Sequence, residues 1–404
     1  MVFIRKQHCK NPTIAFWNLI KRPLPYSIPD FLTEIFPGKT VSYCANARAG
    51  IYEAVKSLNI GDGDHVLVPA FNCGSEVDPI LVLKAEVTLF PVGKDTIICA
   101  DEIASRIKKN TKAIYIIHYF GFHQPEMPRI LELARTKGIP VIEDCALSLF
   151  SEAKTDDIED SSDFSIYCFY KYYPVIGGGA LVCNQADMAQ KFNKPFPKRL
   201  ERNTIIKSLL QTVFGEYIYR NLVNTAKRIL RKDAVDKTSA KMNSRPSMPL
   251  NYYFNSVFDQ AQISKVTKKL LLSYNPVDMV AARRRNFLLV QEELKDVKFA
   301  TPLFSTLPKG VCPLSFPILV SKQEILCKAL NEAQIDATPW WSGYHLGLDW
   351  DNQEAACFLK DHLISLPIHQ YLEPKQIVYM IETLKKLLEN NECQIVEFGE
   401  RNAA

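Results

Sequence analysis

The sequence predicts an α/β protein whose main part is a mostly parallel, mixed sheet flanked by helices, followed by a smaller α+β domain at the C-terminal end. Three observations carry this prediction. The chain has 404 residues, more than one hydrophobic core usually organises. Short β-rich runs alternate with helical stretches up to residue 193. After residue 250 this alternation gives way to several helices and one further strand.

The predicted strands of the large domain are short β-rich runs at residues 65–71, 86–92, 113–120, 140–144, 164–169 and 179–183. Helical stretches lie around them at residues 49–58, 75–84, 101–109, 127–137 and 186–193. Sheets of this doubly wound kind bind ligands beyond the carboxyl ends of their strands. The residues that end or follow these strands are therefore the first candidates for a functional site.

The second half of the chain follows a different pattern. Residues 193–245 interrupt the alternation and predict inserted helices, after which helices at 257–273 and around 281–294 lead into the smaller domain. That domain is predicted from a strand at 314–320 and helices at 322–333 and 375–391. The predicted division is an N-terminal segment at 1–40, a large ligand-binding domain at 41–192, a basic helical insertion at 193–250, and linking helices with the small domain at 251–404.

The insertion carries many lysines and arginines among apolar clusters such as Leu209-Leu210. One interpretation is a basic amphipathic surface that touches an anionic membrane or a lipid-linked substrate. We favour the other interpretation, a solvated helical hairpin that supports a dimer contact. The formal net charge of +5 is too mild to indicate nucleic acid, and it is compatible with an anionic small substrate.

Composition predicts a reduced, cytoplasmic protein. Hydrophobic residues make up 47% of the chain and charged residues 23%, as in ordinary globular proteins. No apolar run is long enough for a membrane span, and the first residues lack a secretory signal. The 11 cysteines are scattered without any C-x-x-C pair, which argues against a zinc site and against a disulfide framework.

Asp144 and Lys171 form the most informative pair. Asp144 closes the apolar run 139–144, and Lys171 follows the predicted strand at 164–169, shortly before Gly177-Gly178-Gly179. A carboxylate at the end of a parallel strand can keep a pyridine nitrogen protonated, and a lysine on a later strand or loop can bind an aldehyde covalently. Together they indicate pyridoxal 5′-phosphate as the cofactor.

Seven motifs along the chain, in this order, resemble those of a known family. The chain resembles the DegT/DnrJ/EryC1/StrS family of pyridoxal-phosphate-dependent nucleotide-sugar aminotransferases, of fold type I, from about residue 40 to 390. The motifs are the segments 46–50, 61–71, 118–121, 141–146, 165–180, 340–346 and 366–369.

The resemblance implies roles for individual residues. Asp144 and Lys171 match the catalytic pair, and Ala47 and Arg48 match the helix start that holds the cofactor phosphate. Either Ser165 or Cys168 matches a further phosphate contact, and the two stay open. The other matches are Phe71 or Cys73 for stacking on the ring, Asn251 supplied by the partner subunit of a homodimer, and His118, Trp341, Tyr344 and His345 for substrate binding.

Three departures from the family pattern bear on activity. Cys73 stands where an aromatic residue usually stacks, and Leu147 stands where a polar residue usually approaches the ring. An ungapped alignment places Tyr173 at the lysine position, although the distance to the three glycines favours Lys171.

The function that the resemblance implies is transfer of an amino group, with glutamate as the expected donor, to a keto-deoxy sugar on a nucleotide for polysaccharide or glycan biosynthesis. Two alternatives stay open. The departures also suit a catalytically degenerate member that acts as a binding or scaffold partner. A sugar dehydratase of the same family would carry a histidine in place of the lysine, and no histidine lies between Ser165 and Pro174.

Overall fold

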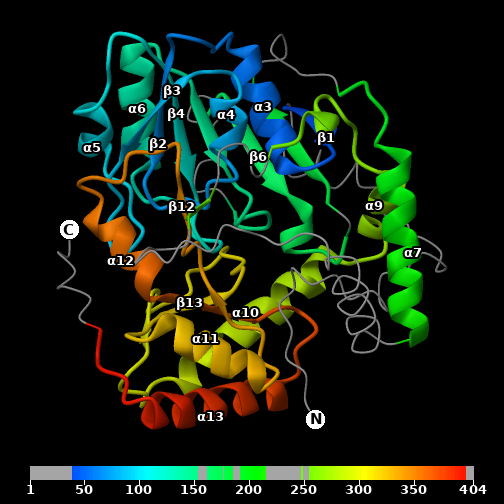
Figure 1. Ribbon diagram of the computed structural model, residues 1–404, viewed down its shortest axis with the longest axis vertical. Coiled ribbons are helices and arrows are strands. Elements are labelled where there is room, and N and C mark those ends of the chain that lie inside the picture. Colours follow the sequence, from blue (N-terminus) through cyan, green and yellow to red (C-terminus); the bar gives the residue numbers. More distant parts are fainter. Residues whose placement is uncertain are drawn as a thin grey trace, which may run out of the picture.

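The computed structural model describes residues 39–152, 162–175, 177–184, 192–214, 247–248 and 254–396. A seven-stranded sheet lies among helices, and a smaller four-stranded sheet with its own helices lies beside it (Figure 1). The predicted α/β class is therefore confirmed. The N-terminal segment, much of the basic insertion and Asn251 lie outside the described residues.

The large sheet is parallel except for one strand. Its order is β1-β7-β6-β5-β4-β2-β3, and β7 runs antiparallel to both of its neighbours. Most residues of the inner strands are buried on both faces, as expected where helices cover a parallel sheet. The strands are β1 (Thr40–Cys44), β2 (His65–Pro69), β3 (Glu86–Phe90), β4 (Thr111–Ile117), β5 (Val141–Asp144), β6 (Phe164–Cys168) and β7 (Gly179–Cys183).

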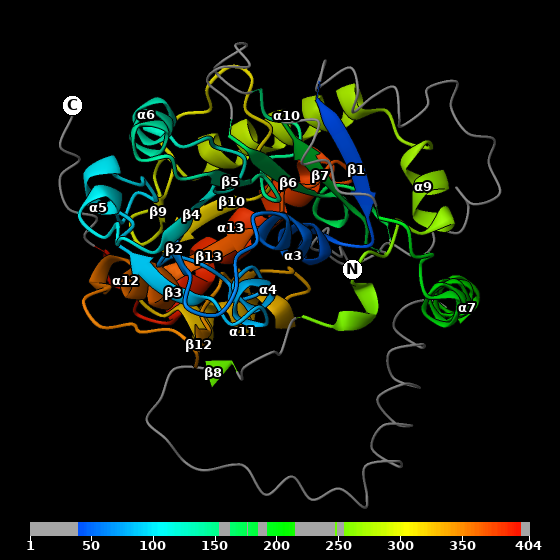
Figure 2. The same cartoon turned by 90° about the horizontal axis from the view of Figure 1, so that it is seen from above.

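Helices lie on both faces of this sheet (Figure 2), with α3 (Ala47–Ser57) on one face and α6 (Met127–Lys137) on the other. Asn46 caps α3, because its side chain accepts a hydrogen bond from the N–H of Ala49 at 3.0 Å. Gly138 ends α6 in the left-handed conformation, with φ of 62°. The other helices of this part are α4 (Asp78–Leu81), α5 (Ala100–Ala104), α7 (Lys198–Phe214) and α9 (Lys265–Leu271).

The small domain has its own apolar core. In its sheet, β10 (Phe316–Leu319) pairs antiparallel with β13 (Leu363–Leu366), and buried side chains of α10 (Pro276–Glu293) and α13 (Pro374–Asn390) join the same core. The remaining elements are β8 (Ser247–Met248), β9 (Thr301–Pro302), β11 (Thr338–Pro339), β12 (Tyr344–His345), α11 (Gln323–Glu332) and α12 (Glu354–His362). The domain boundaries given above stay a prediction.

All six predicted strands of the large domain are present, but three predicted helices are much shorter than expected. The helix predicted at 101–109 is reduced to α5. The helix predicted at 75–84 is reduced to α4, because side chains of the preceding loop bind the backbone N–H groups of Cys73 and Gly74. The helix predicted at 257–273 is reduced to α9 and a short 3₁₀ turn, because the backbone at residues 261–262 pairs with Cys44 and Lys194 instead.

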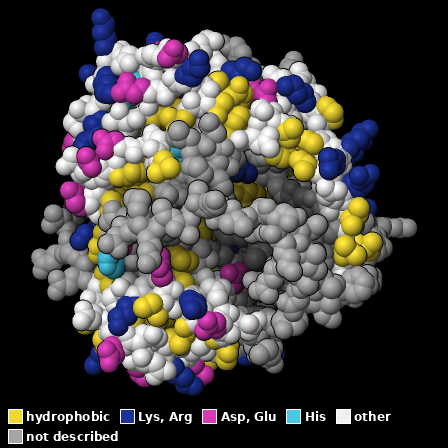
Figure 3. Space-filling model, in the orientation of Figure 1, with side chains coloured by type: hydrophobic (Ala, Val, Ile, Leu, Met, Phe, Trp, Pro, Cys, Tyr) yellow, Lys and Arg dark blue, Asp and Glu magenta, His cyan; other side chains and the backbone are white. Residues whose placement is uncertain are grey.

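The described start of the insertion is the helix α7. Apolar and basic side chains lie along the edge of the molecule over this helix (Figure 3). Its exposed apolar residues are Leu200, Ile206, Leu209 and Leu210. None of the helices in the described ranges is long and apolar enough to cross a membrane. The membrane and dimer interpretations of the insertion stay predictions.

Candidate active site

Asp144 ends β5 as a buried carboxylate with fixed geometry. Its Oδ2 accepts a hydrogen bond from the hydroxyl of Tyr115 at 2.8 Å, and its Oδ1 accepts one from the N–H of Ala146 at 2.8 Å. Burial raises the pKa of Asp144, and the positive charge of Lys171 opposes this shift. The carboxylate and the lysine are therefore within electrostatic reach of each other.

Lys171 lies in the 3₁₀ turn Phe169–Lys171 that follows β6. Burial raises the pKa of both the Cys73 and the Cys168 thiols, and in each case the charge of Lys171 opposes the rise. The lysine thus lies near the ends of β2, β5 and β6 together. Tyr173, its rival in an ungapped alignment, is buried against the ring of Phe150 at 5.6 Å. We therefore retain Lys171 as the predicted catalytic lysine.

The start of α3 supplies the anion-binding end of the site. Its 11 residues begin with Ala47 and Arg48, and the first N–H groups of a helix have no partner within the helix. Gly179 approaches this start so closely that an added Cβ would lie 2.6 Å from the carbonyl oxygen of Tyr167 and 3.0 Å from the N of Ala47. The backbone cradle around Ala47 therefore requires glycine at position 179.

The strand register separates Ser165 from Cys168. Ser165 pairs with Glu143, and Ile166 pairs with Asp144, so Ser165 projects to the face opposite Asp144. Cys168 lies two residues after Ile166 and shares the face of Asp144. Between the two positions that were left open, the geometry disfavours Ser165 and favours Cys168.

Phe71 and Cys73 follow β2 with different surroundings. The Phe71 ring is fully buried, with the rings of Tyr119 and Trp341 at 5.4 and 5.2 Å. Cys73 is partly exposed and lies within the field of Lys171. Of the two candidates for contact with the cofactor ring, the geometry favours the thiol of Cys73.

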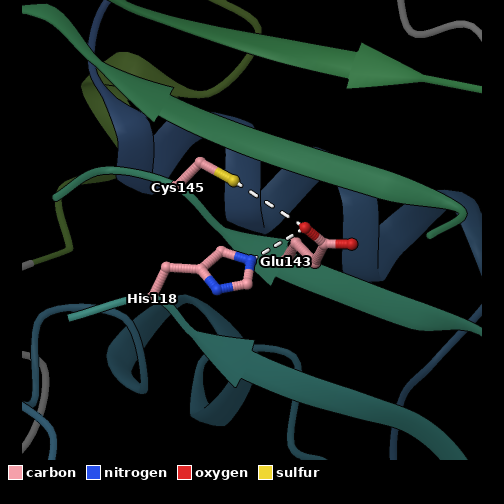
Figure 4. Close-up of side chains that lie close together, drawn as sticks. All are labelled: His118, Glu143 and Cys145. Atoms are coloured by element: carbon pink, nitrogen blue, oxygen red, sulfur yellow. Dashed lines mark hydrogen bonds and ion pairs between the residues drawn. The ribbon is translucent and has the colours of Figure 1, made fainter. Parts of the chain in front are cut away.

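His118 lies on the wrong face of the sheet for substrate binding. It follows β4, and its ring is buried beside Glu143, whose carboxylate lies 2.9 Å from Nε2 (Figure 4). Its Nδ1 accepts a hydrogen bond from the N–H of Gln124 at 3.0 Å, so the neutral ring carries its proton on Nε2 and donates it to Glu143. Both ring nitrogens are used within the protein. The geometry therefore disfavours the predicted substrate contact of His118 and favours a structural role.

The same tautomer argues against a metal at this point. Ligand atoms of His118, Glu143 and Cys145 all lie within 4.8 Å of one another, which makes them a candidate metal group among the described residues. A metal on Nε2 needs that nitrogen without its proton, and Nδ1 already faces a backbone donor. Burial also raises the pKa of the Cys145 thiol well above its usual range, which disfavours the thiolate. We read this group as a structural hydrogen-bond cluster.

His345 and Tyr344 are also committed to the protein interior. His345 is buried with its Nε2 at 2.7 Å from Oδ1 of Asp78, and its Nδ1 accepts a hydrogen bond from the N–H of Gly347. The Tyr344 hydroxyl lies 3.3 Å from a carboxylate oxygen of Asp361. Neither side chain has the open polar tip that a sugar contact needs. The geometry therefore disfavours the substrate-binding prediction for both His345 and Tyr344.

We expect His345→Asn to destabilise the protein without weakening substrate binding. The change breaks a buried pair that joins β12 to α4, and the free energy of unfolding should fall by roughly 3 kcal/mol. Denaturant unfolding measures this loss, and the KM of the acceptor should stay within about twofold of wild type, a difference of under 0.5 kcal/mol. A large rise of KM at unchanged stability would restore the substrate role.

Trp341 is the one predicted substrate residue that the structure leaves partly open near the site. Its ring contacts those of Phe71 and Tyr119, and its backbone is held at a φ of 54°. A positive φ is uncommon for a large residue and is found where surrounding structure enforces it. Trp341 therefore remains a predicted substrate contact.

Sequence reasoning missed three residues around the site. Tyr115 binds Asp144, Glu76 is buried beside Cys73, and Lys360 donates from α12 to the carbonyl oxygens of residues 72, 341 and 343. Burial lowers the pKa of Lys360 to about 8. Tyr115 could have been found from the strand register, because it lies two residues before Ile117, which pairs with Asp144. No local pattern points to the other two.

Comparison with known proteins matches the first part of the chain to a family. The sequence profile of the DegT/DnrJ/EryC1/StrS aminotransferase family matches residues 37–201. GDP-perosamine synthase of Escherichia coli O157:H7 is 24% identical over 319 residues, which cover 72% of this chain and 85% of that protein. The uncharacterized protein MJ1066 of Methanocaldococcus jannaschii is 32% identical over 149 residues, 36% of this chain, and the chain spans only 38% of that protein.

A solved structure extends the similarity over the whole chain. The aminotransferase PseC of Helicobacter pylori, involved in the biosynthesis of pseudoaminic acid, superposes with a TM-score of 0.65 at 15% identity. The match covers 96% of this chain and all of PseC, so the similarity in fold includes both domains of this chain. The profile match and the shared fold agree with the motifs read from the sequence: residues 37–201 match the DegT/DnrJ/EryC1/StrS aminotransferase family, and the whole chain is similar in fold to PseC.

Proposed function

We propose that the protein is a pyridoxal-phosphate-dependent aminotransferase that takes an amino group from glutamate and passes it to a keto sugar carried on a nucleotide. The observation that carries this proposal is the convergence of Asp144 and Lys171 at the carboxyl ends of adjacent parallel strands, beside the start of α3. Members of the family that residues 37–201 match catalyse reactions of this kind. GDP-perosamine synthase is related to this chain by sequence, and PseC is related to it by fold. We infer a role in glycan biosynthesis.

The residues present fit the cofactor. The cradle at Gly179 and the start of α3 suit a phosphate, and Arg48 lies near enough for its charge to oppose the raised pKa of the Cys168 thiol. Asp144 has two protein donors that orient its carboxylate toward a third partner. When bound, the cofactor supplies an electron sink for the bonds of the amino-donor carbon.

The remaining chemistry falls to side chains of this chain. Asp144, held by Tyr115 and Ala146, would keep a proton on the ring nitrogen by its negative charge. Lys171 would hold the cofactor and, once its amine is released, carry the proton to and from the reacting carbon. Trp341 would cover the acceptor side of the site. The buried lining around Asp144 excludes water from these proton transfers.

Neither alternative, a catalytically degenerate scaffold protein or a sugar dehydratase, receives support. Asp144 is held by two protein donors and Lys171 lies within its electrostatic reach, whereas a degenerate member has no reason to keep both. The dehydratase reading needs a histidine in place of Lys171, and the described turn after β6 offers none. We further propose a cytoplasmic homodimer whose active sites lie at the subunit interface, with Asn251 of each chain serving the other.

Glutamate added to the reconstituted protein tests the proposal. The visible absorption of the bound cofactor should bleach, and one equivalent of 2-oxoglutarate per active site should form without any acceptor, as two separate half reactions require. A panel of keto-deoxy nucleotide sugars should then restore the original spectrum. Aspartate and glutamine serve as matched donor controls. A cofactor band that no amino acid bleaches would contradict the aminotransferase assignment.

A further inference from the structure

Glu76 is a buried carboxylate that no motif accounts for. It lies in the loop between β2 and α4, with only 3% of its surface exposed. Its Oε1 accepts a hydrogen bond from the N–H of Cys73 at 2.9 Å, and its Oε2 accepts one from the Cys73 thiol at 2.8 Å and one from the hydroxyl of Ser75 at 3.1 Å. Each oxygen therefore has a different task.

The first task is structural and local. Binding the Cys73 N–H closes the turn that leads into α4, in the manner of a glutamate that reaches back three residues at a helix start. A glutamine would perform this task as well as a glutamate, because it requires only an acceptor oxygen. The charge of Glu76 is not needed for the turn.

The second task brings the charge of Glu76 into the active site. Burial raises the pKa of Asp144 and of the Tyr115 hydroxyl, and the negative charge of Glu76 raises both further. The Cys73 thiol, to which Glu76 is bound, lies within the field of Lys171. The charge of Glu76, in the loop after β2, thus acts on the same part of the site as Asp144 at the end of β5.

We propose that Glu76 is a positioning residue of the reaction, which directs the Cys73 thiol by a hydrogen bond and adds a second negative charge to the site that contains Asp144 and Lys171. This inference rests on the proposed function. The thiol gives the cofactor ring a thin, polarizable contact surface. The carboxylate favours positive charge on the nitrogen that Lys171 contributes, and so extends the protonated form of the holoenzyme to higher pH.

Glu76→Gln tests the charge while it preserves the turn. Burial and Glu76 together raise the pKa of Cys73 well above its usual value, so loss of the carboxylate should lower it. In the cofactor-free protein, the rate of Cys73 alkylation by iodoacetamide, measured by peptide mass spectrometry against Cys99 in the same chain, should rise about threefold to tenfold. In the holoenzyme, the pH at which half of the visible band is lost should move down.

Asp78→Asn is the matched control. Asp78 is another buried carboxylate, two residues further along, but it pairs with His345 and not with Cys73. We expect this variant to lose stability, with Cys73 alkylation and the spectral midpoint as in wild type. If Glu76→Gln does not fold, Glu76→Asp serves instead, because its shorter side chain withdraws the carboxylate from the thiol and keeps the charge. Alkylation of Cys73 should then rise, while the pH at which half of the visible band is lost should stay as in wild type.

The outcomes separate this inference from the proposed function. A wild-type protein that shows no cofactor band contradicts the function, whereas Cys73 alkylation still decides the contact with Glu76. A normal wild-type band together with unchanged alkylation and an unchanged midpoint in Glu76→Gln overturns the inference and leaves the function standing. If Glu76 had only a structural role, Glu76→Gln would lower the melting temperature and would change neither Cys73 alkylation nor the pH midpoint of the visible band.

Discussion

Lys171→Ala should remove the visible band of the reconstituted protein and lower the amino-transfer rate by about 10³-fold or more. The variant loses both the covalent attachment of the cofactor and the base that moves the proton, and each of these contributes orders of magnitude in enzymes. The fold should stay intact, because Lys171 is partly exposed and lies outside both apolar cores. Absorption spectra and single-turnover rates with glutamate measure the effect.

Tyr173→Phe is the control for this prediction. Tyr173 occupies the position that an ungapped alignment would assign to the lysine, yet it is buried against Phe150 and Tyr274. The variant should keep the band and most of the rate. Borohydride should fix the cofactor to the peptide that contains Lys171. An adduct on another lysine, or a band that survives in Lys171→Ala, would show that Lys171 is not the attachment point.

The large sheet could be predicted because its strands are continuous apolar runs. Segments such as 113–117 and 179–183 are buried on both faces, and burial of this kind leaves a strong local pattern in the sequence. The missed elements are β1, β13, α12 and several very short strands. β9 and β11 contain two residues each and pair only through tertiary contacts with β10 and β13. A two-residue strand has no periodicity to read.

The candidate site was predictable as far as strand ends are concerned. Asp144 and Lys171 were found because carboxyl ends of parallel strands meet at one edge of a sheet. The face of the sheet on which each side chain lies was harder to predict. Ser165 and His118 lie on the face opposite Asp144, and assigning them needed the register between β4, β5 and β6. A slip of one residue moves a side chain to the other face.

Long-range partners explain the other misses. His345 resembled a sugar-binding residue beside its aromatic neighbours, but its partner Asp78 is 267 positions away in sequence. Glu76 sits among polar residues in a loop, where a solvated side chain is the ordinary expectation. The same loop is anchored by Lys360 of α12, whose Nζ donates a hydrogen bond to the carbonyl oxygen of Asn72. Such roles exist only once the chain has folded.

Lys360→Met should destabilise the protein by roughly 3 kcal/mol at pH 7, because three buried carbonyl oxygens lose their donor. In wild type, Nζ of this buried lysine donates to the carbonyl oxygens of Asn72 at 2.6 Å, Trp341 at 2.8 Å and Gly343 at 2.9 Å. These bonds tie the loop of Cys73 and Glu76 to the small domain. Cofactor affinity should therefore fall with stability, as equilibrium dialysis and denaturant unfolding would show.

The pH dependence of the free energy of unfolding tests whether the charge of Lys360 causes this effect. Burial lowers the pKa of Lys360 from 10.5 to about 8, so between these values the unfolded chain binds the proton and the folded chain does not. Wild-type stability gains from rising pH in this window, by about 2 kcal/mol from pH 7 to pH 9.5, and the variant lacks this gain. The difference between the two proteins should thus widen on the alkaline side. Lys328→Met, which changes an exposed lysine of α11, should show neither the loss nor the widening. A constant difference across this range would mean that folding does not shift the pKa of Lys360.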